Sequence, residues 1–245
     1  MNIEIELAGL RLRLGLQLPE TARYFQNYIT AVGCPAYDVT LDPEDPGQYP
    51  LVCFDGVLTP HAEEYMLIAR ASQFLLRHRR VVIHGVSFLR HGKAWLITAT
   101  SGTGKTTQLR HWQRLWPEEI ELINGDKTVL QLREDGRLWL HPSPWTGKER
   151  DIGTANGELG GIVVLQQADH NSIRRLTPRE SVLRVFQQFM ILGDTEEEVR
   201  AACEIEDSVL HSVPVWLLEN LGDETSAALT RECLDEYEAE NHETV

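Results

Sequence analysis

The chain has 245 residues, of which 42% are hydrophobic, and this is enough for one substantial core with a small lobe beside it. Its 37 acidic and 23 basic residues give a formal net charge of -14, which disfavours nucleic acid and anionic membranes as partners. The N-terminus does not resemble a secretory signal and no apolar stretch reaches bilayer length, so we expect a soluble cytoplasmic protein.

The first 79 residues predict a small α+β lobe. Leucines alternate with polar residues between Leu7 and Leu18, at the period of a β-strand. In chain order, the expected elements are a hairpin over 7–18, a helix over 22–31 capped by Thr21, strands around 37–40 and 51–54, and a long helix from Pro60.

Residues 80–220 predict an α/β core, in which short apolar runs rich in β-branched residues are joined by helical segments. The expected strands are 81–83, 94–98, 120–123, 129–132, 161–165 and 213–217. The expected helices are 106–116, 178–189 and 196–208. Residues 221–245 add a closing acidic helix over 224–238. The pattern as a whole indicates a core sheet covered by helices.

The segment from Ala99 to Thr107 matches the P-loop rule, with Ala99 in place of the first glycine. It follows an apolar strand and precedes a helix, so its backbone N–H groups and the positive helix end are expected to face phosphate. The expected nucleotide ligands are Ser101, Gly102, Thr103, Gly104, Lys105, Thr106 and Thr107. An ordinary glycine-rich turn with an exposed lysine is the alternative. The sequence therefore predicts binding of ATP or a related nucleotide.

A carboxylate is also required across such a site, either to hold Mg²⁺ through water or to take a proton from an attacking hydroxyl. Asp126 stands at the end of an apolar strand some twenty residues after the loop, where an acid of this kind belongs. An ordinary turn after Asn124-Gly125 is the alternative interpretation. We expect Thr106 and Asp126 to bind the Mg²⁺ that accompanies ATP.

Several of these stretches carry a family resemblance. The strand at His84–Val86 leads into the loop at Ser101–Thr106, and an acidic segment follows at Leu122–Asp126. In these features the chain resembles the bacterial HPr kinase/phosphorylase fold and the nucleotide half of ATP-dependent phosphoenolpyruvate carboxykinase. Pro144–Lys148 and Asn171–Pro178 are similar to HPr-kinase-related proteins found beside peptide natural-product genes. The resemblance implies an α/β P-loop core of this type with a small α+β N-terminal lobe.

The chain also departs from the family pattern. HPr kinase carries paired aspartates in its second motif, whereas Gly125 stands in the first position here. The later Glu-x-Arg-Gly-Leu-Gly signature is absent, and Asn156–Gly161 stands near its place. Both departures weaken the expectation of a reverse phosphorylase reaction more than that of a forward kinase.

The resemblance implies further site residues. His84 would lie beside the loop, close to the γ-phosphate or the acceptor hydroxyl, and Lys148 would be a mobile cation that closes over the transferring phosphate. With Asp126 they make the expected catalytic set. A structural histidine and an ordinary surface lysine are the alternatives. Left open are the roles of Arg150, Arg174 and Arg175, which are either phosphate or substrate ligands or solvated surface residues, and of Glu158 as a second Mg²⁺ ligand.

The function that follows as an expectation is transfer of the γ-phosphoryl group of Mg-ATP to a Ser or Thr hydroxyl of a protein or peptide, such as a natural-product precursor. Two alternatives stay open: a kinase of a small molecule such as free serine, and a regulator that binds nucleotide without catalysis. The basic residues Arg11 and Arg13 and the run at 77–80 are candidate contacts for a peptide acceptor. The sequence leaves open whether copies form a homo-oligomer.

Overall fold

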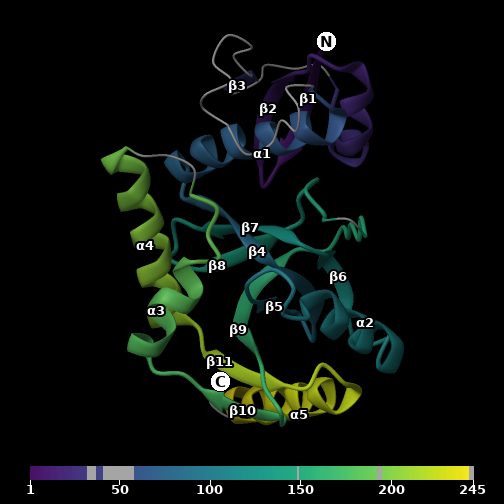
Figure 1. Cartoon of the computed structure of the whole chain (residues 1–245). Coiled ribbons are helices and arrows are strands. Elements are labelled where there is room, and N and C mark those ends of the chain that lie inside the picture. The colour runs from purple at the N-terminus through teal and green to yellow at the C-terminus, as the bar shows by residue number, and fades with distance from the viewer. Residues whose placement is uncertain (32–36, 41–57, 148, 192–194, 243–245) are drawn as a thin grey trace.

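The computed structural model describes residues 1–31, 37–40, 58–147, 149–191 and 195–242 (Figure 1). The described residues of the N-terminal lobe form three strands, one 3-10 helix and one α-helix. In order they are β1 (Asn2–Leu7), β2 (Leu10–Gly15), η1 (Pro19–Tyr28), β3 (Tyr37–Thr40) and α1 (Pro60–Arg77). β1 and β2 pair antiparallel, and β3 joins β2 in parallel. The predicted strand at 51–54 lies outside the described residues.

Two predictions in this lobe need correction. The hairpin begins five residues earlier than predicted, because Ala8 and Gly9 make the turn, both at positive φ. The helix predicted over 22–31 is instead the 3-10 helix η1, and Thr21 lies inside it. Thr21 donates its hydroxyl hydrogen to the buried carboxylate of Glu63 on α1, which also accepts the backbone N–H of Leu18 at 3.1 Å. A contact with α1 therefore replaces the predicted helix cap.

The rest of the chain forms one large sheet with helices around it. Its elements are β4 (Arg80–Arg90), β5 (Lys93–Thr98), α2 (Lys105–Leu115), β6 (Glu121–Asn124), β7 (Lys127–Leu132), β8 (Leu138–His141), β9 (Gly157–Gln167), β10 (Ser172–Arg175), α3 (Pro178–Phe186), α4 (Glu196–Ser212), β11 (Val215–Asn220) and α5 (Glu224–His242). The predicted core strands and helices are confirmed in place and type, whereas β8 and β10 were not predicted. None of the described helices is both long and apolar enough to span a membrane.

The sheet has the strand order β10-β11-β9-β5-β4-β7-β8, with β6 paired to β4. β5, β9 and β11 are parallel, and β4 runs antiparallel to β5, β6 and β7. β8 also pairs with β9, so β4, β7, β8, β9 and β5 form a closed ring of strands. β5 and β6 run the same way on the two sides of β4, and the segments that follow them therefore emerge at one edge of the sheet.

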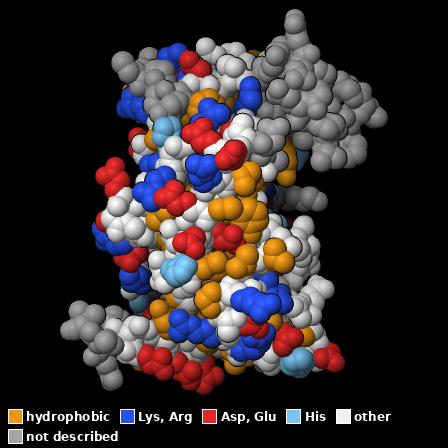
Figure 2. All heavy atoms as spheres, turned by 90° about the vertical axis from the view of Figure 1, so that its left-hand side faces the viewer, with side chains coloured by type: hydrophobic (Ala, Val, Ile, Leu, Met, Phe, Trp, Pro, Cys, Tyr) orange, Lys and Arg blue, Asp and Glu red, His pale blue; other side chains and the backbone are white. Residues whose placement is uncertain are grey.

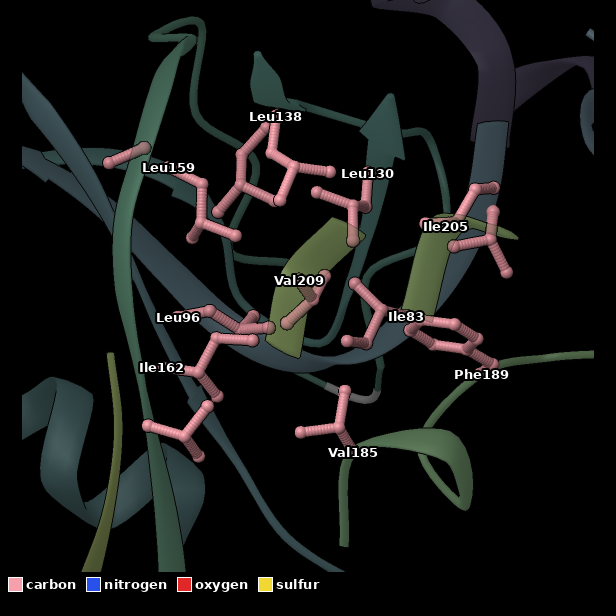
Figure 3. Packing of buried hydrophobic residues seen from close by; sticks show 14 of the residues in the cluster. Ile83, Leu96, Leu130, Leu138, Leu159, Ile162, Val185, Phe189, Ile205 and Val209 are labelled. Carbon is pink, nitrogen blue, oxygen red and sulfur yellow. The ribbon is translucent and has the colours of Figure 1, made fainter. Parts of the chain in front are cut away.

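Three hydrophobic clusters hold these layers together. The first joins strand residues such as Leu96, Leu130 and Ile162 to Val185 of α3 and Val209 of α4 (Figure 3). The second packs α2 and α5 against β4, β5, β9 and β11. The third joins the N-terminal lobe to the sheet and includes Val82, Val129 and Trp145.

The face formed by α3 and α4 carries acidic and basic side chains interspersed among hydrophobic ones (Figure 2). Leu183 on α3 is 67% exposed and Val199 on α4 is 43% exposed. Single apolar side chains among charges of both signs are ordinary for a protein surface. This face therefore offers no strong local charge of either sign.

Candidate functional site

The loop between β5 and α2 has the backbone that a phosphate cradle needs. Gly102 has φ +81° and Gly104 has φ +113°, and a Cβ atom added to either would meet nothing within 4 Å. Glycine is required there by backbone rotation and not by lack of space. Gly104 is the N-cap of α2 and has no side chain with which to cap it, so the first N–H groups of the helix are left for another acceptor.

Lys105 lies folded over the same loop. Its Nζ donates to the carbonyl oxygens of Ala99 at 3.0 Å and Thr100 at 3.2 Å, and the residue is 7% exposed. Burial lowers the pKa of this ammonium group; the carboxylate of Asp126 opposes that shift, and the charge of Lys127 adds to it. A cation whose partners in the described chain are two neutral carbonyls gains much from a bound anion.

A cavity of about 930 Å³ brings this loop together with distant parts of the chain. Ser101 and Thr106 line it from the loop, with His84 of β4 and Asp126 at the end of β6. Thr103 lines a second, smaller cavity together with Ala99 and Thr100, and Thr107 is exposed. Of the predicted residues, Ser101, Thr106, His84 and Asp126 thus line one cavity.

Asn124 builds the turn that presents Asp126. It is fully buried at the end of β6, and its Oδ1 accepts the backbone N–H groups of Asp126 and Lys127, both at 2.9 Å. Its Nδ2 donates to the carbonyl oxygen of Ser143 at 2.9 Å. The Asn-Gly-Asp segment is therefore a turn, as the alternative interpretation had it, and this turn directs the acid into the cavity.

The Asp126 carboxylate is held by three donors. His84 Nε2 lies 3.1 Å from Oδ1, the backbone N–H of Gly147 donates to Oδ2 at 3.1 Å, and Lys127 Nζ donates to the same oxygen. Burial alone would raise the pKa of Asp126, but the hydrogen bond with His84 and the charge of Lys127 outweigh it and lower the pKa below its usual range. The group is therefore ionised throughout the physiological range.

Lys127 was missed in the sequence. It begins β7 beside His84, its register partner on β4, and its Nζ lies 5.8 Å from the centre of the Tyr65 ring on α1. Its position directly after the predicted acid Asp126 was a sequence signal that could have identified it. Lys127 places a second cation near Asp126 and links the core to the N-terminal lobe.

The N-terminal lobe forms another part of the cavity wall. His61, Glu64, Tyr65 and Ile68 line it from one face of α1, at the i, i+3, i+4, i+7 spacing of a helix face. Arg23 and Tyr24 line it from η1, and the Arg150 guanidinium lies 4.4 Å from the centre of the Tyr24 ring. Apart from Arg150, whose role the sequence left open, none of these residues was predicted.

Three of the basic residues predicted as acceptor contacts form ion pairs within the fold. Arg13 pairs with Glu4 and Asp38, Arg77 pairs with Glu198, and Arg79 pairs with Glu204, and none of these arginines lines the cavity. Contact of these residues with an acceptor therefore stays a prediction.

Three further candidates can now be placed. Glu158 on β9 pairs with Lys93 at 3.0 Å, Arg174 pairs with Glu180 at 2.9 Å, and the Arg175 guanidinium lies 5.9 Å from the centre of the Tyr237 ring. None of these three residues lines the cavity, so the cavity gives no support to a phosphate or Mg²⁺ role for them. Lys148 lies outside the described residues, and its neighbours Gly147 and Glu149 line the cavity.

Close packing explains why position 125 is a glycine. A Cβ atom there would lie 2.6 Å from Cβ of Asp151 and 3.0 Å from its carbonyl oxygen, which accepts the Gly125 N–H at 2.9 Å. The loop that carries Arg150 and Asp151 thus packs directly on the turn before Asp126. A side chain at position 125 is incompatible with this packing, and Asp151 instead lines the cavity.

Gly125→Ala is therefore expected to lower the free energy of unfolding by about 1–3 kcal/mol, as overpacking does elsewhere. Chemical denaturation would measure the change. Asp151→Gly in the same chain should recover part of the loss, because it removes the nearer of the two clashing atoms. A Gly125→Ala protein as stable as the wild type would contradict this account of the turn.

The described residues contain no cluster of three or more His, Cys, Asp or Glu side chains able to hold a metal ion by themselves. Mg²⁺ in nucleotide sites commonly keeps several waters and takes one or two protein ligands together with substrate phosphates. Thr106 and Asp126 both reach the cavity and supply such a hydroxyl and carboxylate. These residues fit a magnesium ion that arrives with a nucleotide.

Comparison with known proteins gives a distant structural likeness. No family model matches the sequence, and no curated protein matches it. Among solved structures, the HPr(Ser) kinase/phosphatase from Coxiella burnetii aligns with 64% of this chain and 98% of its own, at 15% identity and a TM-score of 0.35. A likeness this distant carries no functional conclusion, so the function has to follow from the residues of the cavity.

Proposed function

We propose that this protein is a kinase that transfers the γ-phosphoryl group of Mg-ATP to a Ser or Thr hydroxyl of a protein or peptide. One observation carries the proposal. The loop residues Ser101 and Thr106 line the same cavity as His84, Asp126 and Lys127, which contact one another. Residues of the N-terminal lobe line this cavity as well. A site that only binds nucleotide does not need the residues of the N-terminal lobe, whereas a site that transfers phosphate needs room and contacts for a second substrate.

The donor half is formed by the loop and the start of α2. The backbone N–H groups after Gly102 and Gly104 and the ammonium group of Lys105 would bind the β- and γ-phosphates. Mg²⁺, when bound by Thr106 and by Asp126 directly or through water, supplies charge neutralisation on the phosphate oxygens. Lys105 would leave its two carbonyl partners for the phosphates, because a charged partner is the stronger one.

The acceptor hydroxyl would approach from the side of the N-terminal lobe. Its oxygen forms a bond to the γ-phosphorus, the bond from that phosphorus to the bridging oxygen breaks, and ADP leaves with the electron pair. His84 and Lys127 flank the Asp126 carboxylate and can donate hydrogen bonds to phosphate oxygens. Lys148 is proposed to add a further cation from the loop beside Gly147.

The nature of the acceptor is the finer part of the proposal. A peptide acceptor, such as a natural-product precursor, fits the family that the sequence resembles. A free amino acid is the second candidate, because the cavity is lined by two cations, Arg23 of the lobe and Arg150 of the core, and by the carboxylate of Glu64. These groups could hold the carboxylate and the ammonium group of one small zwitterion.

Incubation with [γ-³²P]ATP and Mg²⁺ tests the proposal. One set of reactions contains a library of peptides that each carry a single Ser or Thr, and another contains free L-serine or L-threonine. Label in peptide supports the proposed function, and label in phosphoserine or phosphothreonine supports the second candidate. Nucleotide binding without transfer to any of these acceptors would contradict both and favour a regulator.

A further inference from the structure

The Asp126 carboxylate is poorly suited to remove the proton of the acceptor hydroxyl. Both of its oxygens already accept hydrogen bonds, from His84 on one side and from Lys127 and the Gly147 backbone on the other. A proton acceptor needs a lone pair that other donors do not occupy. Asp126 is better suited to hold a metal ion and the two neighbouring side chains.

Glu64 is the other carboxylate with the required placement. It lies in the second turn of α1, is 8% exposed and lines the same cavity as Ser101 and Asp126. Within the described residues its hydrogen-bond partner is His61, whose Nδ1 lies 3.3 Å from Oε2. This is one long contact on one oxygen, whereas Asp126 has three donors on two oxygens. Glu64 therefore has acceptor capacity directed into the cavity and not used by the fold.

We propose that Glu64 is a catalytic residue that accepts the proton of the acceptor hydroxyl during phosphoryl transfer; the inference rests on the proposed function. As the oxygen forms its bond to phosphorus, its O–H bond breaks and the proton passes to a Glu64 oxygen. The bond to the bridging oxygen of ATP breaks in the same transfer, so atoms and charge balance with no further reactant. The protonated glutamic acid then returns its proton to solvent after the products leave.

The charges around Glu64 suit this role. Burial raises its pKa, while His61 on the same helix, Arg150 from the loop and Lys127 from β7 partly oppose that rise. Arg23 of η1 and Tyr65 of α1 line the same cavity, and the loop acids Glu149 and Asp151 also face it. A carboxyl whose pKa is raised toward neutral pH is a stronger proton acceptor than one at the ordinary value.

The preceding residue provides a matched control. Glu63 is fully buried, and its carboxylate accepts from the backbone of Gln17 and Leu18 and from the Thr21 hydroxyl, all in the N-terminal lobe. It does not line the cavity. Glu63 and Glu64 are therefore adjacent buried acids on one helix, one engaged in the fold and the other facing the site.

The experiment compares Glu64→Gln, Glu63→Gln and wild type in single-turnover transfer from Mg-ATP to the single-hydroxyl peptides and the free amino acids. Glu64→Gln is expected to slow transfer by about 10²–10³-fold, the usual contribution of a general base, and to leave the Kd for Mg-ATP within about twofold of wild type. Glu63→Gln should lower the melting temperature and leave the transfer rate of the folded protein unchanged.

The pH dependence gives a second test. The carboxylate is the active form, so the wild-type rate should fall on the acid side, at an apparent pKa above the ordinary glutamate value. Glu64→Gln should lose this limb, whereas Glu63→Gln should keep it. Titration of ¹³C-labelled glutamate carboxyls by NMR, assigned with Glu64→Gln, reads the same pKa without catalysis.

The outcomes separate the two proposals. If wild type transfers phosphate and Glu64→Gln matches its rate and pH profile, Glu64 is not the base. The same conclusion follows if Glu64→Gln loses only thermal stability or only affinity for Mg-ATP. If wild type binds Mg-ATP but transfers to no acceptor, the proposed function fails and this inference fails with it.

Discussion

Lys105→Met is expected to bind Mg-ATP about a hundredfold more weakly than wild type, a loss of about 3 kcal/mol. The reason is that Nζ is the buried cation of the loop, held by two neutral carbonyls that it can exchange for phosphate oxygens. Methionine keeps the aliphatic stem and removes the charge. Isothermal titration with a non-hydrolysable ATP analogue and Mg²⁺ would measure the change.

The same variant should not lose stability in the absence of nucleotide. Burial lowers the pKa of Lys105, which means that the folded chain disfavours the charged form relative to the unfolded chain. Removing the charge therefore removes a cost of folding. Lys93→Met is the control, because Lys93 is exposed and pairs with Glu158 away from the cavity. Unchanged affinity in Lys105→Met would refute the assignment of the loop as the phosphate site.

Asp126→Asn is expected to reduce phosphoryl transfer by at least about 10²-fold and to raise the Mg²⁺ concentration needed for half-maximal rate. Asparagine keeps the shape and one acceptor oxygen but removes the charge that holds Lys127 and His84. Nucleotide binding without metal should change little, because the loop and Lys105 are untouched. Rate measurements across a Mg²⁺ titration would show both effects.

This pattern differs from that expected for Glu64→Gln, which should slow transfer without shifting the Mg²⁺ requirement. Asp135→Asn serves as the control, since Asp135 is an exposed residue that pairs with Arg137 outside the cavity. Transfer at the full rate in Asp126→Asn would show that this carboxylate has no part in the reaction. A lower rate with an unchanged Mg²⁺ requirement would show that Asp126 takes part in the reaction but does not bind the metal ion.

The parts of the fold that were predicted depend on local signals. Pro60 begins α1 as expected, and the hydroxyl of Thr59 caps it by accepting the N–H of Ala62 at 3.1 Å. The 3-10 helix η1 was mistaken for an α-helix because its geometry depends on Glu63, a residue 42 positions from Thr21. The strands β8 and β10 were not predicted; each lies antiparallel to a predicted strand, β7 or β11.

The predicted residues of the site likewise have local sequence signals, whereas the missed ones depend on contacts between distant parts of the chain. The loop around Lys105 is one continuous motif, and Asp126 follows a clear apolar strand, so the sequence was sufficient to find both. Glu64 and Tyr24 come from the N-terminal lobe, and nothing near them in the sequence distinguishes them from ordinary helical residues. Only the packing of that lobe on the sheet brings them to the cavity.

That packing has a consequence for any attempt to shorten the protein. A chain that began at Arg80 would keep the whole phosphate loop and Asp126, and so would look like a minimal catalytic fragment. It would also present Val82, Val129 and Trp145 to water, because the cluster that buries them takes most of its members from the first 79 residues. Such a fragment would be prone to aggregation. The N-terminal lobe is therefore needed to cover these apolar side chains of the sheet, whatever its part in binding a substrate.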